Sequence, residues 1–245
     1  VIDKMYVILP FEEDFYKKRH NYKVDFVGHP LLDAIENENT FNKNNFLLVN
    51  NLSKKPIIAL LPGSRNQEIN KLLPVMLEAV SNLNDYQLVI AGAPSKSVDY
   101  YEKIIQSSNL NTNIIKVISN QTYNILRVSK AAIVTSGTAT LETALFNVPQ
   151  VVCYKTSWAS YIIGRLLIHN LKYISLVNII QDREVVKELI QNDCNKINLV
   201  KELQKILDKK NRSSMLAEYK ALKTKLGGKG ASKKTADLIN MYLGN

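Results

Sequence analysis

The sequence predicts an α/β protein built on a doubly wound parallel sheet. Short apolar runs rich in β-branched residues recur along its 245 residues, and segments with apolar residues at helical spacing separate most of them. Two of these runs lead directly into a turn rich in glycine or hydroxyl residues and then into a helical pattern. Because this alternation is typical of parallel sheets covered on both faces, we expect a Rossmann-like fold.

The expected elements follow one another in a regular order. Strands are expected near residues 5–9, 24–27, 56–61, 86–91, 113–117, 131–134 and 150–154. Helices are expected at 11–18, 41–49, 198–208, 213–225 and 231–243, and between most of the later strands. The cluster Gly227-Gly228-Lys229-Gly230 predicts a hinge before the last helix, because glycine adopts backbone conformations that other residues avoid.

The first candidate site follows the apolar run 57–61. Gly63 lets the chain turn, Ser64 is the expected N-cap of a helix, and Glu68 lies in the first turn of that helix. The free amides at such a helix start attract anions, and Arg65 adds a guanidinium group that suits a pyrophosphate. The alternative is an ordinary strand-to-helix turn with an exposed arginine. The apolar residues at helical spacing behind the turn are Ile69, Leu72, Leu73, Met76 and Leu77.

The second candidate site follows the apolar run 131–134. A hydroxyl-rich turn leads into a helix there, which predicts a second helix start that receives anions. The residues of interest are Ser136, Gly137, Thr138, Thr140 and Glu142. The hydroxyl groups supplement the backbone amides, and the carboxylate of Glu142 is suited to accept hydrogen bonds from a ribose diol. The alternative is that Glu142 only complements the helix dipole.

Several segments together resemble one enzyme family, the lipid-A-disaccharide synthases. They occur in that family's order and at its spacing, and the resemblance covers about residues 1–245. The segments are Phe26–Leu31, Leu61–Pro74, Ser136–Glu142, Tyr154–Lys155, Ser175–Asn178 and Asp182–Leu189.

The resemblance implies the C-terminal, donor-binding half of a GT-B fold and a role in the biosynthesis of lipid A and lipopolysaccharide. It implies an inverting glycosyltransferase that uses no metal and no cofactor. That enzyme would transfer diacylglucosamine from its UDP donor to the 6-hydroxyl of diacylglucosamine 1-phosphate. Arg65 would stabilise the leaving group. The implied UDP-binding residues are Gly63, Ser64, Arg65, Glu68, Ser136, Gly137, Thr138, Thr140, Glu142, Asn178 and Arg183.

The family's chain is considerably longer at its amino end. We therefore expect residues 1–27 to be a remnant of the acceptor domain and residues 28–55 to connect the domains. Residues 56–226 would form the donor domain, and residues 227–245 a helix that crosses back onto the acceptor domain. The family's proposed catalytic base belongs to the acceptor domain, so no residue here is assigned that role. By itself this chain is expected to be inactive.

Two alternative functions stay open. One is another UDP-sugar enzyme of the same fold, such as an epimerase or the peptidoglycan glucosaminyltransferase. The other is a nucleotide-binding subunit that is not catalytic alone and depends on a separate chain for the acceptor half. The expected protein partners are a second copy of this chain or such a complementary chain.

Composition favours a cytoplasmic protein, and the implied lipid substrates place it peripherally on the inner face of the cytoplasmic membrane. Hydrophobic residues make up 46% of the chain, yet no apolar run approaches the ~20 residues of a membrane-spanning helix. Cys153, beside a strand, and Cys194, in a polar loop, lack metal-ligand spacing and do not indicate a disulfide framework.

The net charge of +10 is unevenly placed, because residues 201–245 hold eleven Lys and Arg against four Asp and Glu. Such a basic segment suits anionic lipid headgroups or a phosphorylated substrate, and the alternative is a solvated helix face. The basic residues are not interleaved with aromatic residues in a recognisable module, so nucleic acid is not an expected partner.

A broad apolar stripe occupies the start of residues 158–180. Its members are Trp158, Tyr161, Ile162, Ile163, Leu166 and Leu167, bounded by Arg165, His169 and Lys172. A basic amphipathic helix of this kind can lie in a membrane interface or line an acyl-chain groove, and the alternative is a core helix. His29, before Pro30, is expected to form hydrogen bonds at the domain junction rather than to act on substrate. His20 and His169 show no metal or acid–base pattern.

Overall fold

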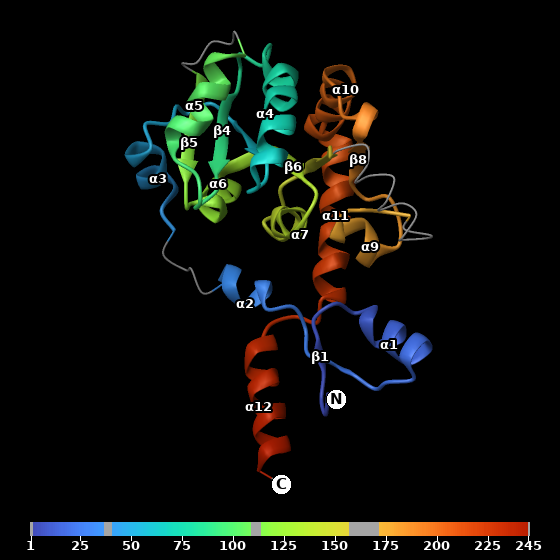
Figure 1. Cartoon of the computed structure of the whole chain (residues 1–245). Helices are drawn as coiled ribbons and strands as arrows, with labels where there is room; N and C mark the ends of the chain where they lie inside the picture. Colours follow the sequence, from blue (N-terminus) through green and yellow to red (C-terminus); the bar gives the residue numbers. More distant parts are fainter. Residues whose placement is uncertain (1, 37–40, 109–113, 157–171, 245) are drawn as a thin grey trace. The chain divides into compact units, whose positions relative to one another are not determined.

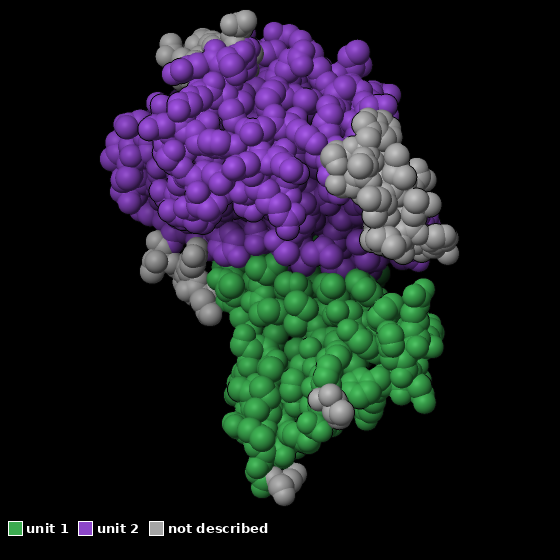
Figure 2. Space-filling model, viewed as in Figure 1, with its two compact units in different colours: residues 1–40, 217–245 green, residues 41–216 purple. Residues whose placement is uncertain are grey.

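The computed structural model describes residues 2–36, 41–108, 114–156 and 172–244 (Figure 1). They belong to two compact units, one of residues 1–40 with 217–245 and one of residues 41–216 (Figure 2). The expected stripe from Trp158 to Leu167, together with His169, lies outside the described residues. The domain boundaries expected at residues 28, 56 and 227 stay a prediction.

The larger unit is built on a parallel six-stranded sheet with the strand order β5-β4-β3-β6-β7-β8. The strands are β3 (Ile57–Leu61), β4 (Gln87–Gly92), β5 (Ile115–Ser119), β6 (Ser129–Thr135), β7 (Gln150–Tyr154) and β8 (Lys187–Ile190). The chain runs outward from β3 to β5, returns to pair β6 with β3, and then continues to the opposite edge. The predicted doubly wound, Rossmann-like fold is therefore confirmed.

Helices cover both faces of this sheet, which explains why its central strands are continuous apolar runs. Ile58 and Leu60 pack into a cluster with α4 (Asn66–Val80), α5 (Val98–Gln106) and α10 (Lys196–Leu207). Ile57 and Ala59 pack on the other face with α3 (Lys43–Val49) and α6 (Thr122–Val128). The remaining elements of the unit are α7 (Thr138–Leu145), α9 (Leu176–Gln181), the 3-10 turn η2 (Gln191–Asp193) and the first half of α11 (Lys209–Lys225).

The smaller unit contains a short parallel pair of strands, β1 (Tyr6–Val7) and β2 (Asp25–Phe26). Its helices are α1 (Glu12–His20), α2 (Leu31–Glu36), the end of α11 and α12 (Ala231–Leu243). The carboxylate of Asp33 accepts the N–H groups of Gly230 and Ser232 at 2.6 and 3.1 Å, which satisfies the start of α12 and lowers the pKa of Asp33. The N–H of His29 donates to the carbonyl of Leu226 at 3.1 Å, in keeping with the structural role expected of that histidine.

Two features differ from the sequence-based expectation. Strand β8 was not predicted, because Lys-Glu-Leu-Ile at 187–190 is only half apolar, as suits a strand at the edge of the sheet. Cys194 lies in the polar loop between η2 and α10, but its side chain is only 1% exposed and belongs to the same core cluster as Cys153, and both thiols are free. Within the described ranges, no helix combines the length and the apolar character needed to cross a bilayer.

Candidate functional site

A cavity of about 430 Å³ in the larger unit brings the two glycine turns together. It lies where β3 and β6 end, at the point where the strand order reverses, which is where open α/β sheets bind ligands. The expected site residues that line it are Gly63, Ser64, Arg65, Glu68, Ser136, Gly137, Thr138 and Glu142. Two sequence segments about seventy residues apart thus share one cavity.

A third segment lines the same cavity and was not predicted. It runs from Ala91 to Pro94, which is the end of β4 and the two residues after it, and Thr122 at the start of α6 contributes as well. A Cβ atom on Gly92 would lie 2.5 Å from the hydroxyl oxygen of Ser119, so the neighbouring strand leaves no room for a side chain. The run of small residues directly after an apolar strand was the available signal in the sequence.

The turn after β3 is closed by Glu68 rather than capped by Ser64. Helix α4 begins at Asn66 with Arg65 at the N-cap, so the expected N-cap was wrong by one residue. One carboxylate oxygen of Glu68 accepts the N–H groups of Ser64 and Arg65, both at 3.3 Å. The other lies 3.1 Å from the guanidinium of Arg65. A carboxylate that reaches back from the first turn of the helix therefore satisfies the N–H groups of the two residues that precede the helix.

Gly63 makes this arrangement possible. Its φ angle is +96°, and a Cβ atom placed there would lie 2.5 Å from the carboxylate of Glu68. In this conformation Glu68 occupies the donors that we expected an anionic ligand to use. The side chain of Arg65 is 82% exposed and remains accessible from the cavity.

In the turn after β6, two of the three expected hydroxyl groups form hydrogen bonds within the chain. Gly137 is the N-cap of α7, and a Cβ atom there would meet nothing within 4 Å. The hydroxyl of Ser136 donates to the carbonyl of Ile174 at 3.1 Å. Thr140 is fully buried and does not line the cavity, because its hydroxyl donates to the carbonyl of Gly137 at 2.8 Å. Thr138 is exposed at the cavity wall.

Two further side chains of the cavity wall carry polar atoms in an apolar setting. Burial raises the pKa of the Glu142 carboxyl above its ordinary value. The hydroxyl of Thr135 is buried and has no hydrogen-bond partner in the described part of the chain. Since buried polar groups are normally paired, both side chains are suited to meet the polar atoms of a ligand.

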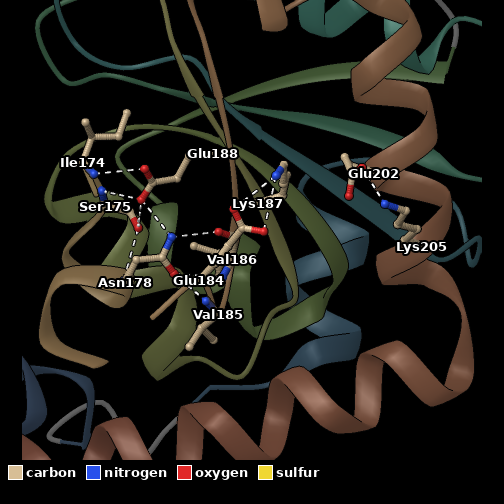
Figure 3. Close-up of polar contacts among 10 residues, drawn as sticks. All are labelled: Ile174, Ser175, Asn178, Glu184, Val185, Val186, Lys187, Glu188, Glu202 and Lys205. Carbon is tan, nitrogen blue, oxygen red and sulfur yellow. Dashed lines mark hydrogen bonds and ion pairs between the residues drawn. The ribbon is translucent and has the colours of Figure 1, made fainter. Parts of the chain in front are cut away.

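Asn178 does not line this cavity, although the sequence suggested it as a donor-binding residue. It is a fully buried residue of α9, and Figure 3 shows its side chain directed toward Val185, Val186 and Glu188. The amide oxygen accepts the N–H groups of Val185 and Val186 at 2.7 and 2.9 Å. The amide nitrogen donates to the carbonyl of Val186 and to Glu188, both at 2.8 Å. All four hydrogen-bonding positions of the amide are used within the chain.

Arg183 is exposed and likewise does not line the cavity. Its N–H donates to the carbonyl of Asn178, so its backbone belongs to the same turn. In the described part of the chain, no three His, Cys, Asp or Glu residues are grouped so as to hold a metal ion. The described residues of the cavity wall therefore offer backbone amides, one guanidinium, hydroxyls and two carboxylates.

Comparison with known proteins gives a consistent result. The family model described as lipid-A-disaccharide synthetase matches residues 1–241. Lipid-A-disaccharide synthases of Francisella tularensis subsp. tularensis (strain WY96-3418) and subsp. novicida (strain U112) are 37% identical over 220 residues, which is 88% of this chain. The chain spans 57% of the length of these relatives.

Solved structures share the fold at much lower identity. The UDP co-structure of S. aureus MnaA is 18% identical, with a TM-score of 0.68 over 99% of this chain and 61% of that one. The glycosyltransferase WaaG, involved in lipopolysaccharide biosynthesis, is 12% identical, with a TM-score of 0.55 over 99% of this chain and 63% of that one. The α/β fold described above is thus one that the MnaA structure and the glycosyltransferase WaaG share.

Proposed function

The chain belongs to the lipid-A-disaccharide synthase family, and from this premise we propose that it supplies the donor-binding part of a hexosyltransferase. The donor would be UDP-2,3-diacylglucosamine and the acceptor 2,3-diacylglucosamine 1-phosphate. The products would be UDP and the disaccharide 1-phosphate from which lipid A is made. The chain spans little more than half of the length of its relatives. We therefore include in this proposal that the chain is inactive by itself.

One observation carries the proposal: both glycine turns line a single cavity at the carboxyl ends of β3 and β6. Each turn leads into a helix whose N-terminus lies at this cavity. Helix N-termini favour a diphosphate because of their free amides and the positive end of the helix dipole. Glu142 stands at the same cavity with a carboxyl suited to a ribose diol. A nucleoside diphosphate has both groups that this wall would recognise.

In the proposed reaction the acceptor hydroxyl displaces UDP from the anomeric carbon with inversion. Negative charge grows on the β-phosphate as the glycosidic bond breaks. Backbone amides of the two turns and the guanidinium of Arg65 would stabilise that charge without a metal ion. Loss of one such preorganised donor typically slows turnover on the order of a hundredfold, which is the effect we expect of Arg65→Ala in a complete enzyme of the family.

Calorimetric titration of this chain with UDP, without divalent metal, tests the proposal. We expect wild type to bind UDP, and Arg65→Ala to bind it about tenfold or more weakly, because a hydrogen bond between charged groups is lost. Arg183→Ala is the comparison variant, since Arg183 is an exposed arginine of the same unit that does not line the cavity. Equal weakening by both substitutions, or no UDP binding by the folded chain, would count against this site.

The partners implied by the function are the two lipid substrates and the membrane surface from which they are drawn. The proposed protein partner is a second copy of the chain or a complementary chain that carries the acceptor half. The protein would act peripherally on the cytoplasmic face of the membrane. Sedimentation of the chain with and without UDP would report its oligomeric state.

A further inference from the structure

We propose that a second cavity, beside the donor cavity, binds a phosphate monoester, and that its occupant is the phosphate of the sugar acceptor. This inference rests on the proposed function for the identity of the sugar phosphate. The cavity measures about 310 Å³ and is lined by Lys71, Lys155, Thr156, Gln191 and Asn192.

The sheet places these residues together. Lys155 and Thr156 follow β7, Gln191 and Asn192 follow β8, and the two strands are paired in parallel up to Tyr154 and Ile190. Parallel strands end at the same edge, so the second cavity lies on the same carboxyl edge as the donor cavity. The fifth lining residue comes from α4, the helix that begins at the donor cavity.

Helix α4 links the two cavities directly. Glu68 lines the donor cavity, and Lys71, three residues later, lines the second one. Residues three apart lie on the same side of a helix, about one turn from each other. Ligands in the two cavities would therefore be neighbours, as the two substrates of a transferase must be.

The charge of the second cavity is positive. Its wall holds two lysines and no carboxylate among the described residues. The ammonium group of Lys155 donates to the carbonyl of Cys194 at a long 3.4 Å, which leaves two of its three N–H groups for other acceptors. Neither Lys71 nor Lys155 forms an ion pair within the described ranges, whereas Lys187, Lys196 and Lys205 are each paired with a glutamate.

Gln191 gives a second, independent indication. Its φ angle of +52° is unfavourable for a residue other than glycine, a strain on the order of 1 kcal/mol. The side chain is held in place because its oxygen accepts the N–H of Thr156 at 2.9 Å. Gln191 is only 6% exposed, and its amide nitrogen lacks a hydrogen-bond partner in the described part of the chain. A buried donor left unpaired is destabilising, so an acceptor supplied by a ligand would explain why this side chain is kept here.

A phosphate monoester fits these groups best. It carries close to two negative charges at neutral pH and three acceptor oxygens, which match two ammonium groups and an amide donor. The proposed acceptor carries such a monoester, whereas the phosphates of the UDP donor are a diester-like pair assigned to the two glycine turns. The second cavity would thus distinguish a phosphorylated acceptor from an unphosphorylated one.

The test uses the whole chain labelled with ¹⁵N and saturated with UDP, titrated with glucosamine 1-phosphate, a monoester without acyl chains. We expect the amide signals of Thr156 and Asn192 to shift without release of UDP. The double variant Lys71→Gln/Lys155→Gln should bind glucosamine 1-phosphate at least about fivefold more weakly and should bind UDP as wild type does. The matched control Lys196→Gln/Lys205→Gln removes the same charge from α10 and should bind both ligands normally.

Three results would overturn the assignment. They are unchanged affinity in the Lys71→Gln/Lys155→Gln variant, displacement of UDP by glucosamine 1-phosphate, and equal affinity for inorganic phosphate and glucosamine 1-phosphate. The last would mean a site for free phosphate rather than for a sugar phosphate. Failure of the proposed function would look different, because UDP itself would not bind to the wild-type chain.

Discussion

At the scale of single residues, the carboxylate of Glu68 is the feature that most changes how the donor site is understood. It holds the amides of Ser64 and Arg65 and pairs with the guanidinium of Arg65 at 3.1 Å. A diphosphate bound at this turn needs the same donors. The carboxylate of Glu68 therefore competes with the diphosphate that is proposed to bind at this turn.

This competition predicts that Glu68→Gln strengthens UDP binding, by about two- to fivefold, because an exposed ion pair contributes little more than that. The amide oxygen of glutamine still accepts the backbone N–H groups, so the turn keeps its shape. Titration calorimetry measures the change. Glu78→Gln is the matched control on the same helix, since Glu78 pairs with Lys196 at 3.7 Å outside the cavity. Weaker UDP binding by Glu68→Gln would show that the carboxylate contacts the ligand favourably instead.

Glu142→Gln is predicted to raise stability and to weaken UDP binding. Because burial raises its pKa in the folded protein, the folded state binds the proton more tightly than the unfolded state does. Protonated Glu142 therefore contributes to stability in acid, below the ordinary carboxyl pKa of 4.5. This contribution is lost as the pH rises through the raised pKa of the folded protein. Glu142→Gln should melt at a higher temperature than wild type at pH 7, and at nearly the same temperature near pH 4.

The same substitution should weaken UDP binding, because an amide is a poorer acceptor for a ribose diol than a carboxylate. Wild-type affinity should fall as the pH drops through the raised pKa of Glu142, and the variant should lack this dependence. Melting curves and UDP titrations at several pH values measure both effects. A variant that is more stable and binds UDP normally would leave Glu142 without a role in the ligand site.

At the scale of elements, Asn178 joins α9 to β8 and to the two residues before β8 through four hydrogen bonds of one buried amide. Asn178→Ala would leave two N–H groups of the backbone unsatisfied. We expect it to lower the free energy of unfolding on the order of 3 kcal/mol, measured by urea denaturation. UDP binding by the folded fraction should persist, because the residue does not line the donor cavity. A variant of normal stability that fails to bind UDP would return Asn178 to the donor site.

The sequence predicted the described strands other than β8, and both glycine turns, because their signals are local. Gly63 and Gly137 each follow an apolar run, and their helices show the apolar spacing of a buried face. The segment Ala91–Pro94 was missed because its contribution depends on β4 lying beside β3, and strand order is not written in a local pattern. The roles of Glu68 and Asn178 could not be predicted either, since each depends on competition among neighbouring donors and acceptors in the folded chain.

At the scale of the whole molecule, charge provides a test of the proposed membrane association. The chain carries a net charge of +10, concentrated in residues 201–245. An anionic membrane attracts basic segments with about 1 kcal/mol per lysine or arginine near its surface, and salt shortens the range of this attraction from about 8 Å at 0.15 M to about 3 Å at 1 M. Binding that depends on this charge must therefore require anionic lipid and must be reversed by salt.

We accordingly expect the chain to sediment with vesicles that contain phosphatidylglycerol at low salt, to be released near 1 M salt, and not to sediment with pure phosphatidylcholine vesicles. Two triple variants of equal net charge separate the effect of where the charge lies from the effect of how much charge there is. Lys209→Gln/Lys210→Gln/Lys220→Gln removes three exposed charges from the basic segment, and Lys43→Gln/Lys54→Gln/Lys103→Gln removes three exposed charges from elsewhere. If the basic segment faces the membrane, the first variant should bind far less than the second although their net charges are equal. Equal loss of vesicle binding in both variants would mean that only the net charge matters. Salt-resistant binding to neutral vesicles would assign the membrane contact to apolar residues instead.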